Sequence, residues 1–386
     1  MRRLPGLDLL RAVAILFVMF YHAQLFDLVS DANPVATFGW MGVDLFFALS
    51  GFLIGGQLFR PIARQEPEHF GLFYARRLFR TLPPYLVVVA FYFTVPIFRE
   101  RTAIQPLWQF LTFAENLFID LSHAKAFSHV WSLCVEEHFY IVAPIIVWLL
   151  ARRPAAWKVI AVCGAVLLGG MALRGYIWMH DLAPIQHVTG GPGSFYRGWQ
   201  ERIYYPTWTR LDGLLDGVVV AMIKAFRPML WERLMRRANL VMGAGLAAVA
   251  IAIALFVHQR ALVPTVIGFP ILATGMACLV AAGDSPQGLI GRIPIPGAGA
   301  VAAMAYSLYL THKQVFHMVQ LVVGGRLNGH LIAQTLLYGG AALAAGGLLY
   351  WAVERPAIRL RDRFLGDGRQ ARRAKAAHDG AEAVAT

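Results

Sequence analysis

The sequence predicts an all-α fold, a polytopic helical bundle in a membrane with about ten transmembrane helices. Hydrophobic residues form 58% of the 386-residue chain and charged residues 15%, whereas soluble domains are about 45–50% apolar. The mean hydropathy is +0.55, and runs of roughly 20 apolar residues, long enough to cross a bilayer, recur along the chain. Because helices satisfy their own backbone hydrogen bonds in lipid, these runs are expected to be helical.

Ten apolar stretches are predicted to cross the membrane. The first follows Arg2 and Arg3 and lacks a small-residue cleavage signal, so it is expected to persist as a span. The third is expected to begin at Pro83 and Pro84. The apolar stretch Leu107–Leu121 is short and interrupted by polar residues, which predicts an interfacial or re-entrant segment. The predicted spans are about 7–28, 38–59, 83–99, 132–151, 157–178, 208–224, 239–257, 262–282, 299–323 and 331–353.

Basic residues predict the orientation, because cytoplasmic loops are enriched in Lys and Arg. With the N-terminus in the cytoplasm, the cytoplasmic segments hold 24 of the 35 basic residues and the opposite side holds seven. Both termini are therefore expected to be cytoplasmic, in a cell inner membrane. The net charge of +13 is then a topology signal, and nucleic-acid binding is not expected. Residues 1–364 are expected to form one transmembrane domain, and 365–386 a basic, disordered tail.

Charged residues inside the first span need an explanation, because a charge at the centre of a bilayer helix costs about 3 kcal/mol even on the mildest scale. Arg11 and His22 face the same way at 100° per residue, about 16 Å apart along the axis, with Asp8 one turn from Arg11. Ordinary interpretations exist, since arginine can extend to the headgroups and histidine can bond a neighbouring helix. Their shared face favours a polar stripe lining a cavity, in which Asp8 orients Arg11.

The second and third spans add an acidic residue and a basic cluster. Asp44 lies near the outer end of the second span and needs a partner, whereas Gly51 and Gly55 indicate close helix packing. The basic cluster precedes the third span on the cytoplasmic side, where it fits membrane anchoring or capture of phosphates by guanidinium groups. The cluster consists of Arg76, Arg77 and Arg80.

Polar residues also begin the fourth and sixth spans. In WSLCVEEHFY, Ser132 and Glu136 share a helix face, whereas the adjacent Glu137 points about 100° away. The two carboxylates are therefore not expected to form a paired acid–base dyad. In TRLDGLLDG, Arg210 and Asp212 lie near the outer boundary.

The ninth and tenth spans and one loop supply the remaining candidates. Tyr309 and His312, in YSLYLTH, share a helix face, and Glu354 closes the tenth span. The loop 178–207, which runs into the sixth span, brings aromatic residues that fit either sugar stacking or an interfacial belt. They are Tyr196, Trp199, Tyr204, Tyr205 and Trp208. No metal-ligand spacing occurs, and the three cysteines lie in apolar spans, so neither a metal site nor a disulfide framework is expected.

Together these motifs resemble the acyltransferase 3 family of integral membrane O-acyltransferases. The resemblance runs from Gly6 to Pro356 through GLDLLRAVAIL…H, GVDLFFALSGFLI, FYARRLFRTLPPY, WSLCVEEHFY, RLDGLLDG, YSLYLTH and ERP. It implies a ten-helix enzyme that moves an acyl group, often acetyl, from cytoplasmic acyl-CoA to a sugar hydroxyl, such as one on a cell-surface glycan. The chain resembles members without a fused hydrolase-like domain. It departs from the family after His312, where Lys313 and Gln314 follow, whereas a proline often stands two residues after the ninth-span histidine and would kink the helix.

The resemblance also implies roles for the candidate residues. The family's arginine and histidine fall on Arg11 and His22, and its R-x-x-R pair on Arg77 and Arg80. The arginines, with Arg76, are expected to hold the phosphates of acyl-CoA, and His22 suits a general base near pH 7. The further catalytic candidates are Glu136 and Glu137. The expected substrate-binding residues are Asp44, Trp131, Ser132, Tyr140, Arg210, Asp212, Tyr309, His312 and Glu354.

Two features of the reaction and one competing function stay open from the sequence. His22 could act as a general base in direct transfer or as a nucleophile that forms a covalent acyl-histidine. The acceptor can approach from either side of the membrane. The competing class is a proton-coupled transporter, because charged intramembrane residues often mark ion routes. The absence of repeat symmetry in the hydropathy pattern argues against a transporter.

Overall fold

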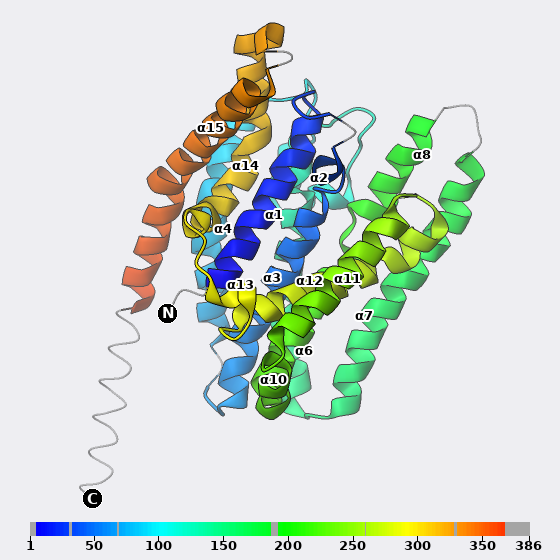
Figure 1. The fold of residues 1–386 in the computed structure, drawn as a ribbon, viewed down its shortest axis with the longest axis vertical. Coiled ribbons are helices and arrows are strands. Elements are labelled where there is room, and N and C mark those ends of the chain that lie inside the picture. The colour runs from blue at the N-terminus through cyan, green and yellow to red at the C-terminus, as the bar shows by residue number, and fades with distance from the viewer. Residues whose placement is uncertain are drawn as a thin grey trace, which may run out of the picture.

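The computed structural model describes residues 5–30, 33–67, 69–186, 192–258, 260–327 and 330–366. The described chain is largely helical, and its long helices pack side by side in a bundle (Figure 1). Short 3₁₀ and π segments extend or connect them. The α-helices are α1 (Pro5–Gln24), α2 (Pro34–Thr37), α3 (Met41–Ala63), α4 (Phe70–Thr94), α5 (Leu107–Leu111), α6 (Trp131–Arg152), α7 (Ala156–Ile177), α8 (Pro192–Trp199), α9 (Asp212–Phe226), α10 (Pro228–Met235), α11 (Ala238–Phe256), α12 (Phe269–Asp284), α13 (Leu289–Arg292), α14 (Ala298–Val323) and α15 (Leu331–Leu349).

The predicted all-α membrane bundle is confirmed. Within the described ranges, seven helices are long and apolar enough to cross a membrane, and each coincides with a predicted span. The other three predicted spans fall on α4, α9 and α14. Helix α9 has only 15 residues, and polar side chains interrupt the apolar runs of α4 and α14. The protein is therefore a multi-pass membrane protein, with buried polar side chains inside a largely apolar core.

Two predicted boundaries differ from the structure. Helix α4 begins at Phe70, so Pro83 and Pro84 lie inside it and the arginine cluster occupies its first turns. The apolar run begins at the prolines because the turns before them carry arginines, two of which line an internal cavity. Membrane helices tolerate internal proline. At the other end, helical structure continues to residue 366, past the predicted start of the tail at 365. The rest of the predicted tail, 367–386, lies outside the described residues.

The segment predicted to be interfacial or re-entrant does not cross the bundle. It contains only the short α5 and a 3₁₀ turn, Glu115–Leu117. The side chains of Glu115 and Asn116 are buried inside the protein. The polar residues that interrupted this apolar stretch therefore point into the fold.

Glycines allow the central helices α3 and α9 to approach closely. A Cβ atom on Gly51 would lie 2.0 Å from the carbonyl oxygen of Leu214, and one on Gly217 would lie 2.2 Å from that of Ala48. Such separations are far below van der Waals contact, so only glycine fits. The close packing predicted for Gly51 is confirmed, and small residues commonly mediate such contacts between membrane helices.

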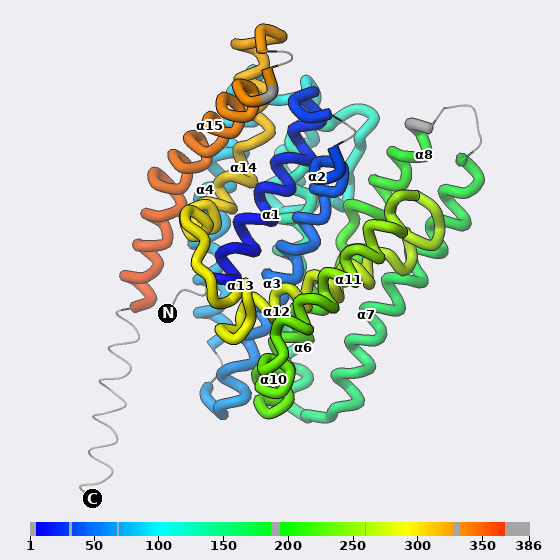
Figure 2. The backbone as a smooth tube through the Cα atoms, viewed as in Figure 1, coloured from blue at the N-terminus to red at the C-terminus, as the bar shows by residue number. Residues whose placement is uncertain are grey.

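The bundle has a buried centre and a lipid-like periphery. Helices α3 and α12 are largely buried, whereas few residues of α7, α11 and the helix that begins with α15 are buried. Figure 2 places α7 and α15 at opposite edges, with α1 and α3 between them. It also shows that the start of α1 and the end of the last described helix lie toward the same side of the bundle. This arrangement agrees with the predicted placement of both termini on one side of the membrane.

Candidate active site

Two cavities lie one after the other along α1 and α14. The first, of about 110 Å³, is lined by Arg11 of α1 and by the N-terminal half of α14. The second, of about 580 Å³, is lined by His22 of α1 and by the following turns of α14. Tyr309 lines both. The polar stripe predicted on the first helix therefore lies along both cavities, with Arg11 at the first and His22 at the second, about 16 Å apart along the axis.

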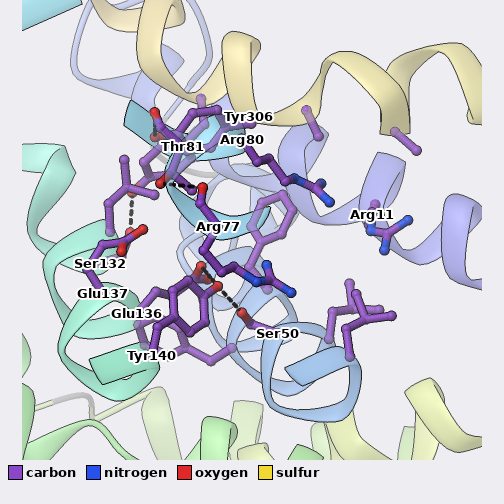
Figure 3. Close-up of a pocket in the computed structure, with 18 residues that line it drawn as sticks. Arg11, Ser50, Arg77, Arg80, Thr81, Ser132, Glu136, Glu137, Tyr140 and Tyr306 are labelled. Atoms are coloured by element: carbon purple, nitrogen blue, oxygen red, sulfur yellow. Dashed lines mark hydrogen bonds between the residues drawn. The ribbon is translucent and has the colours of Figure 1, made fainter. Parts of the chain in front are cut away.

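Three arginines face the first cavity, Arg11 from α1 and both Arg77 and Arg80 from α4 (Figure 3). A guanidinium nitrogen of Arg11 donates to Asp8 Oδ1 over 3.2 Å, the contact expected if Asp8 orients Arg11. The guanidinium of Arg77 lies 5.0 Å from the centroid of the Tyr140 ring. Three guanidinium groups around one cavity can bind a phosphorylated ligand through charge-assisted hydrogen bonds.

The carboxylates predicted to be catalytic also line the first cavity. Glu136 and Glu137 project from α6, together with Tyr140, one turn further along (Figure 3). The Tyr140 hydroxyl donates to Glu136 Oε2 over 2.6 Å and is also hydrogen-bonded to the Ser50 hydroxyl. Both glutamates therefore lie with the arginines, in a different cavity from His22.

His22 is held by a second histidine. His22 Nδ1 lies 2.7 Å from His312 Nε2, and His312 Nδ1 lies 3.0 Å from the backbone oxygen of Leu308. A carbonyl oxygen only accepts, so the proton on His312 belongs to Nδ1 and its Nε2 accepts from His22 Nδ1–H. The network leaves His22 Nε2 unprotonated. A neutral imidazole with a free ring nitrogen at a cavity wall is suited to accept a proton.

A third histidine, which the sequence analysis did not select, lies beside this pair. The His129 ring centroid is 5.9 Å from that of His22 and 5.3 Å from that of His312. His129 is 3% exposed, lines the second cavity, and has no hydrogen-bond partner at either ring nitrogen among the described residues. The signal that could have found it is its position two residues before Trp131, at the start of the WSLCVEEHFY motif.

Tyr309 forms part of the wall between the two cavities. Its hydroxyl lies 2.6 Å from Ser132 Oγ and donates to the backbone oxygen of His129 over 2.5 Å. Ser132 faces the first cavity, and His129 faces the second. Ser132 and Tyr309, each predicted separately to bind substrate, are therefore in contact at the boundary between the arginines and the histidines.

The second cavity combines aromatic and charged side chains. Lys313, which follows His312 directly, forms an ion pair of 3.0 Å with Glu100. Glu100 also accepts hydrogen bonds from the Tyr92 hydroxyl at 2.7 Å and from the backbone nitrogen of Phe127 at 3.0 Å. The aromatic side chains that line the cavity include the predicted Trp131. They are Tyr21, Phe26, Trp40, Trp131, Tyr196, Tyr204, Tyr205 and Tyr309.

The aromatic loop before α9 is divided between three environments. Tyr196, Tyr204 and Tyr205 line the second cavity. Trp199 is buried and donates to Thr265 Oγ1 over 2.9 Å, whereas Trp208 is 49% exposed. Of these residues, only the three tyrosines are placed where a ligand in the second cavity could contact them, and the exposure of Trp208 is that expected of an interfacial residue.

Three residues predicted to bind substrate lie in buried ion pairs and line neither cavity. Asp44 pairs with Arg210 over 2.8 Å, and Asp212 pairs with Arg174 over 2.7 Å. The Arg210 guanidinium also lies 5.1 Å from the centroid of the Trp131 ring. These ion pairs connect helices that surround the second cavity. Their side chains lie behind the residues that line it.

The last two predicted site residues also lie outside the lining. Glu354 is 1% exposed and accepts a hydrogen bond of 2.6 Å from Ser307 Oγ. This contact ties the π segment Tyr350–Glu354 to α14. Arg76 is half-buried on α4 and does not line the cavity that its neighbour Arg77 faces.

Comparison with known proteins places these motifs in one family. Residues 4–351 match the acyltransferase domain of the acyltransferase 3 family. The chain is 26% identical over 338 residues to O-acetyltransferase OatA of Staphylococcus aureus strain NCTC 8325, covering 82% of this chain and 51% of that protein. The OatA proteins of strains COL and MRSA252 match to the same extent. The chain thus spans about half the length of the curated relatives it matches.

No solved structure matches the chain significantly. The family match nevertheless extends from the first predicted span into the last. It includes the arginines of the first cavity and the histidines of the second. The chain belongs to the acyltransferase 3 family.

Proposed function

We propose that this protein transfers an acetyl group from acetyl-CoA to a hydroxyl of a sugar-containing acceptor in the cell envelope. The observation that carries the proposal is the placement of an arginine-lined cavity and a histidine-lined cavity along one helix. The name O-acetyltransferase carried by the S. aureus relatives supports acetyl as the transferred group and oxygen as the receiving atom.

The first cavity is assigned to the donor. Arg11, Arg77 and Arg80 bind the phosphates of acetyl-CoA, because guanidinium groups pair well with phosphate oxygens. A cavity of about 110 Å³ is smaller than the several hundred Å³ of a typical ligand pocket. The nucleotide therefore stays at the mouth and only the pantetheine arm enters. The thioester reaches His22 when the Tyr309 side chain, in the shared wall, moves aside.

The second cavity is assigned to the acceptor, with His22 as general base. His22 Nε2 takes the proton from the acceptor hydroxyl while the hydroxyl oxygen attacks the carbonyl carbon of the thioester. The new carbon–oxygen bond forms as the carbon–sulfur bond breaks, and the imidazolium returns the proton to the departing CoA sulfur. The products are an acetyl ester and CoA with a free thiol.

Other residues support this step without exchanging protons with the substrate. His312 is a positioning residue, because its Nε2 fixes the proton of His22 on Nδ1. Glu136 and Glu137 balance the charge of the arginines in the donor cavity. The buried ion pair of Asp44 and Arg210 stabilises the residues that line the acceptor cavity.

The proposed orientation follows from the distribution of basic residues. The donor cavity opens toward the cytoplasm, where acetyl-CoA is available, and the acceptor cavity toward the opposite side of the inner membrane. The acetyl group then crosses the membrane core between Arg11 and His22, along the stripe that the first helix presents.

The test is acceptor-dependent CoA release by the purified protein supplied with labelled acetyl-CoA and envelope glycans. The wild type is expected to release CoA and label the glycan. His22→Ala is expected to lose at least 10²-fold in rate, the lower range for a positioned general base. Arg153→Gln, an exposed cytoplasmic-loop variant, serves as the matched control. Wild-type transfer by His22→Ala would refute the assigned base, and no CoA release by the wild type would favour the transporter.

A further inference from the structure

We infer that the acceptor is an anionic glycan, whose sugar rings contact the aromatic walls of the second cavity and whose carboxylate or phosphate contacts its basic side chains. The inference rests on the proposed function, since it takes the second cavity as the acceptor site. It adds the charge of the acceptor, which neither the family nor the relatives specify.

The first support is an excess of positive charge in the cavity lining. Among the residues lining the second cavity, Glu100 is the only carboxylate, and it is already paired with Lys313 at 3.0 Å. Three further basic side chains line the cavity with no ion pair among the described residues. They are Arg101, Lys125 and Arg197. Arg197 donates a hydrogen bond of 2.7 Å to Ser122 Oγ.

The second support is His129. A buried polar atom without a hydrogen-bond partner is destabilising, and both ring nitrogens of His129 lack one among the described residues. Because His129 lines the second cavity, a polar group of a ligand bound there can supply the missing partner. The His129 ring lies 5.9 Å from the His22 ring, so that ligand group sits next to the reacting hydroxyl.

The third support is the form of the cavity. A volume of about 580 Å³ falls in the range of small-molecule sites, which are typically 300–1,000 Å³. Tyr204 and Tyr205 pack on Trp131, with ring centroids 4.8 and 5.2 Å from its own. Flat rings of this kind present apolar faces to a sugar. Basic residues at a membrane surface alone would fit lipid headgroups, whereas aromatic walls and a buried histidine fit a carbohydrate.

The charge of the acceptor is tested by comparing two tetrasaccharides, one from neutral chitin and one from hyaluronan, which carries carboxylates. With labelled acetyl-CoA, kcat/KM is expected to be roughly tenfold or more higher for the hyaluronan fragment, since a charge-assisted hydrogen bond contributes about 1.5–3 kcal/mol. This preference should shrink in 0.5 M salt, because exposed charges are screened within several Å. Equal kcat/KM values for the two tetrasaccharides would overturn the inference and leave the transferase proposal intact.

The basic residues are tested by substitution. The double variant Arg101→Gln and Lys125→Gln is expected to reduce kcat/KM for the hyaluronan fragment at least fivefold and to leave that for the chitin fragment within twofold. Arg326→Gln removes an exposed charge that does not line the cavity and should change neither value. An equal loss on both fragments in the double variant would contradict the assigned charge recognition.

Binding without turnover separates this inference from the proposed function. Tryptophan fluorescence of the His22→Ala protein, titrated without acetyl-CoA, should report tighter binding of the hyaluronan fragment, and His129→Phe should weaken it. Competition by sodium glucuronate or by glucose 6-phosphate, each compared with glucose, identifies the preferred anion. If the wild type releases no CoA with any acceptor, the transferase proposal fails while these titrations still decide the charge of the ligand. No binding of either fragment, or equal affinity for both, overturns the inference.

Discussion

Replacing His312 should slow catalysis without preventing donor binding. His312 Nε2 accepts the proton of His22 Nδ1 over 2.7 Å, and the Leu308 carbonyl fixes the His312 tautomer. Loss of a hydrogen bond worth about 0.5–1.5 kcal/mol lets His22 place its proton on the reacting nitrogen. At 1.4 kcal/mol per factor of ten, the ratio of the competent tautomer to the other falls by up to about tenfold, and misorientation of the ring adds to the loss of rate. His312→Leu is therefore expected to lower kcat by about 10- to 100-fold.

The assay is CoA release at saturating acceptor, with acetyl-CoA varied to separate kcat from KM. In His312→Leu, kcat should fall while KM for acetyl-CoA stays within about twofold, since the arginines line the other cavity. His312→Gln, whose amide oxygen can still accept the His22 proton, should recover a measurable part of the rate. A rise in KM with unchanged kcat, or no recovery in His312→Gln despite normal thermal stability, would refute the positioning role.

Three further substitutions test other parts of the structure. Arg77→Gln should raise KM for acetyl-CoA about tenfold or more in the same assay, because a hydrogen bond to a charged group contributes about 1.5–3 kcal/mol. Arg153→Gln should leave this KM unchanged, and equal effects of the two variants would place the donor elsewhere. Gly51→Ala should lower thermal stability in detergent by about 1–3 kcal/mol, the usual cost of overpacking, since its Cβ would meet a backbone oxygen at 2.0 Å; unchanged stability would show that α3 and α9 are less tightly packed. Asp44→Asn leaves the guanidinium of Arg210 buried without its counter-charge. Thermal unfolding should show a loss of stability of about 3–5 kcal/mol. A fully stable variant with impaired acceptor binding would show that Asp44 contacts the substrate instead.

Much of the fold and one face of the site follow from the sequence. Apolar run length identifies the membrane helices because the bilayer imposes it, and helical phase places Arg11 and His22 on one stripe because 100° per residue is a fixed geometry. Helical phase does not reveal which faces meet. His22 and His312 are 290 residues apart, so their contact depends on the packing of α1 against α14.

Charged candidates show a second limit of the sequence. Asp44 was expected to need a partner, and Arg210 supplies it within the protein. A buried charge requires compensation whether it serves structure or substrate, so the residue type alone does not distinguish the two. His129 was missed for a related reason, because a single histidine before a helix is unremarkable until its lack of partners is visible in three dimensions.

The most direct test of the account is transfer across a sealed bilayer. The protein is reconstituted in liposomes, labelled acetyl-CoA is supplied only outside, and the glycan is either trapped inside or added outside. Because only molecules whose donor cavity opens outward meet acetyl-CoA, the result does not depend on uniform insertion. The account predicts that label enters the trapped glycan and not the external one. Label on the external glycan alone would show that donor and acceptor enter from the same side, contradicting transfer from the arginine cavity to the histidine cavity.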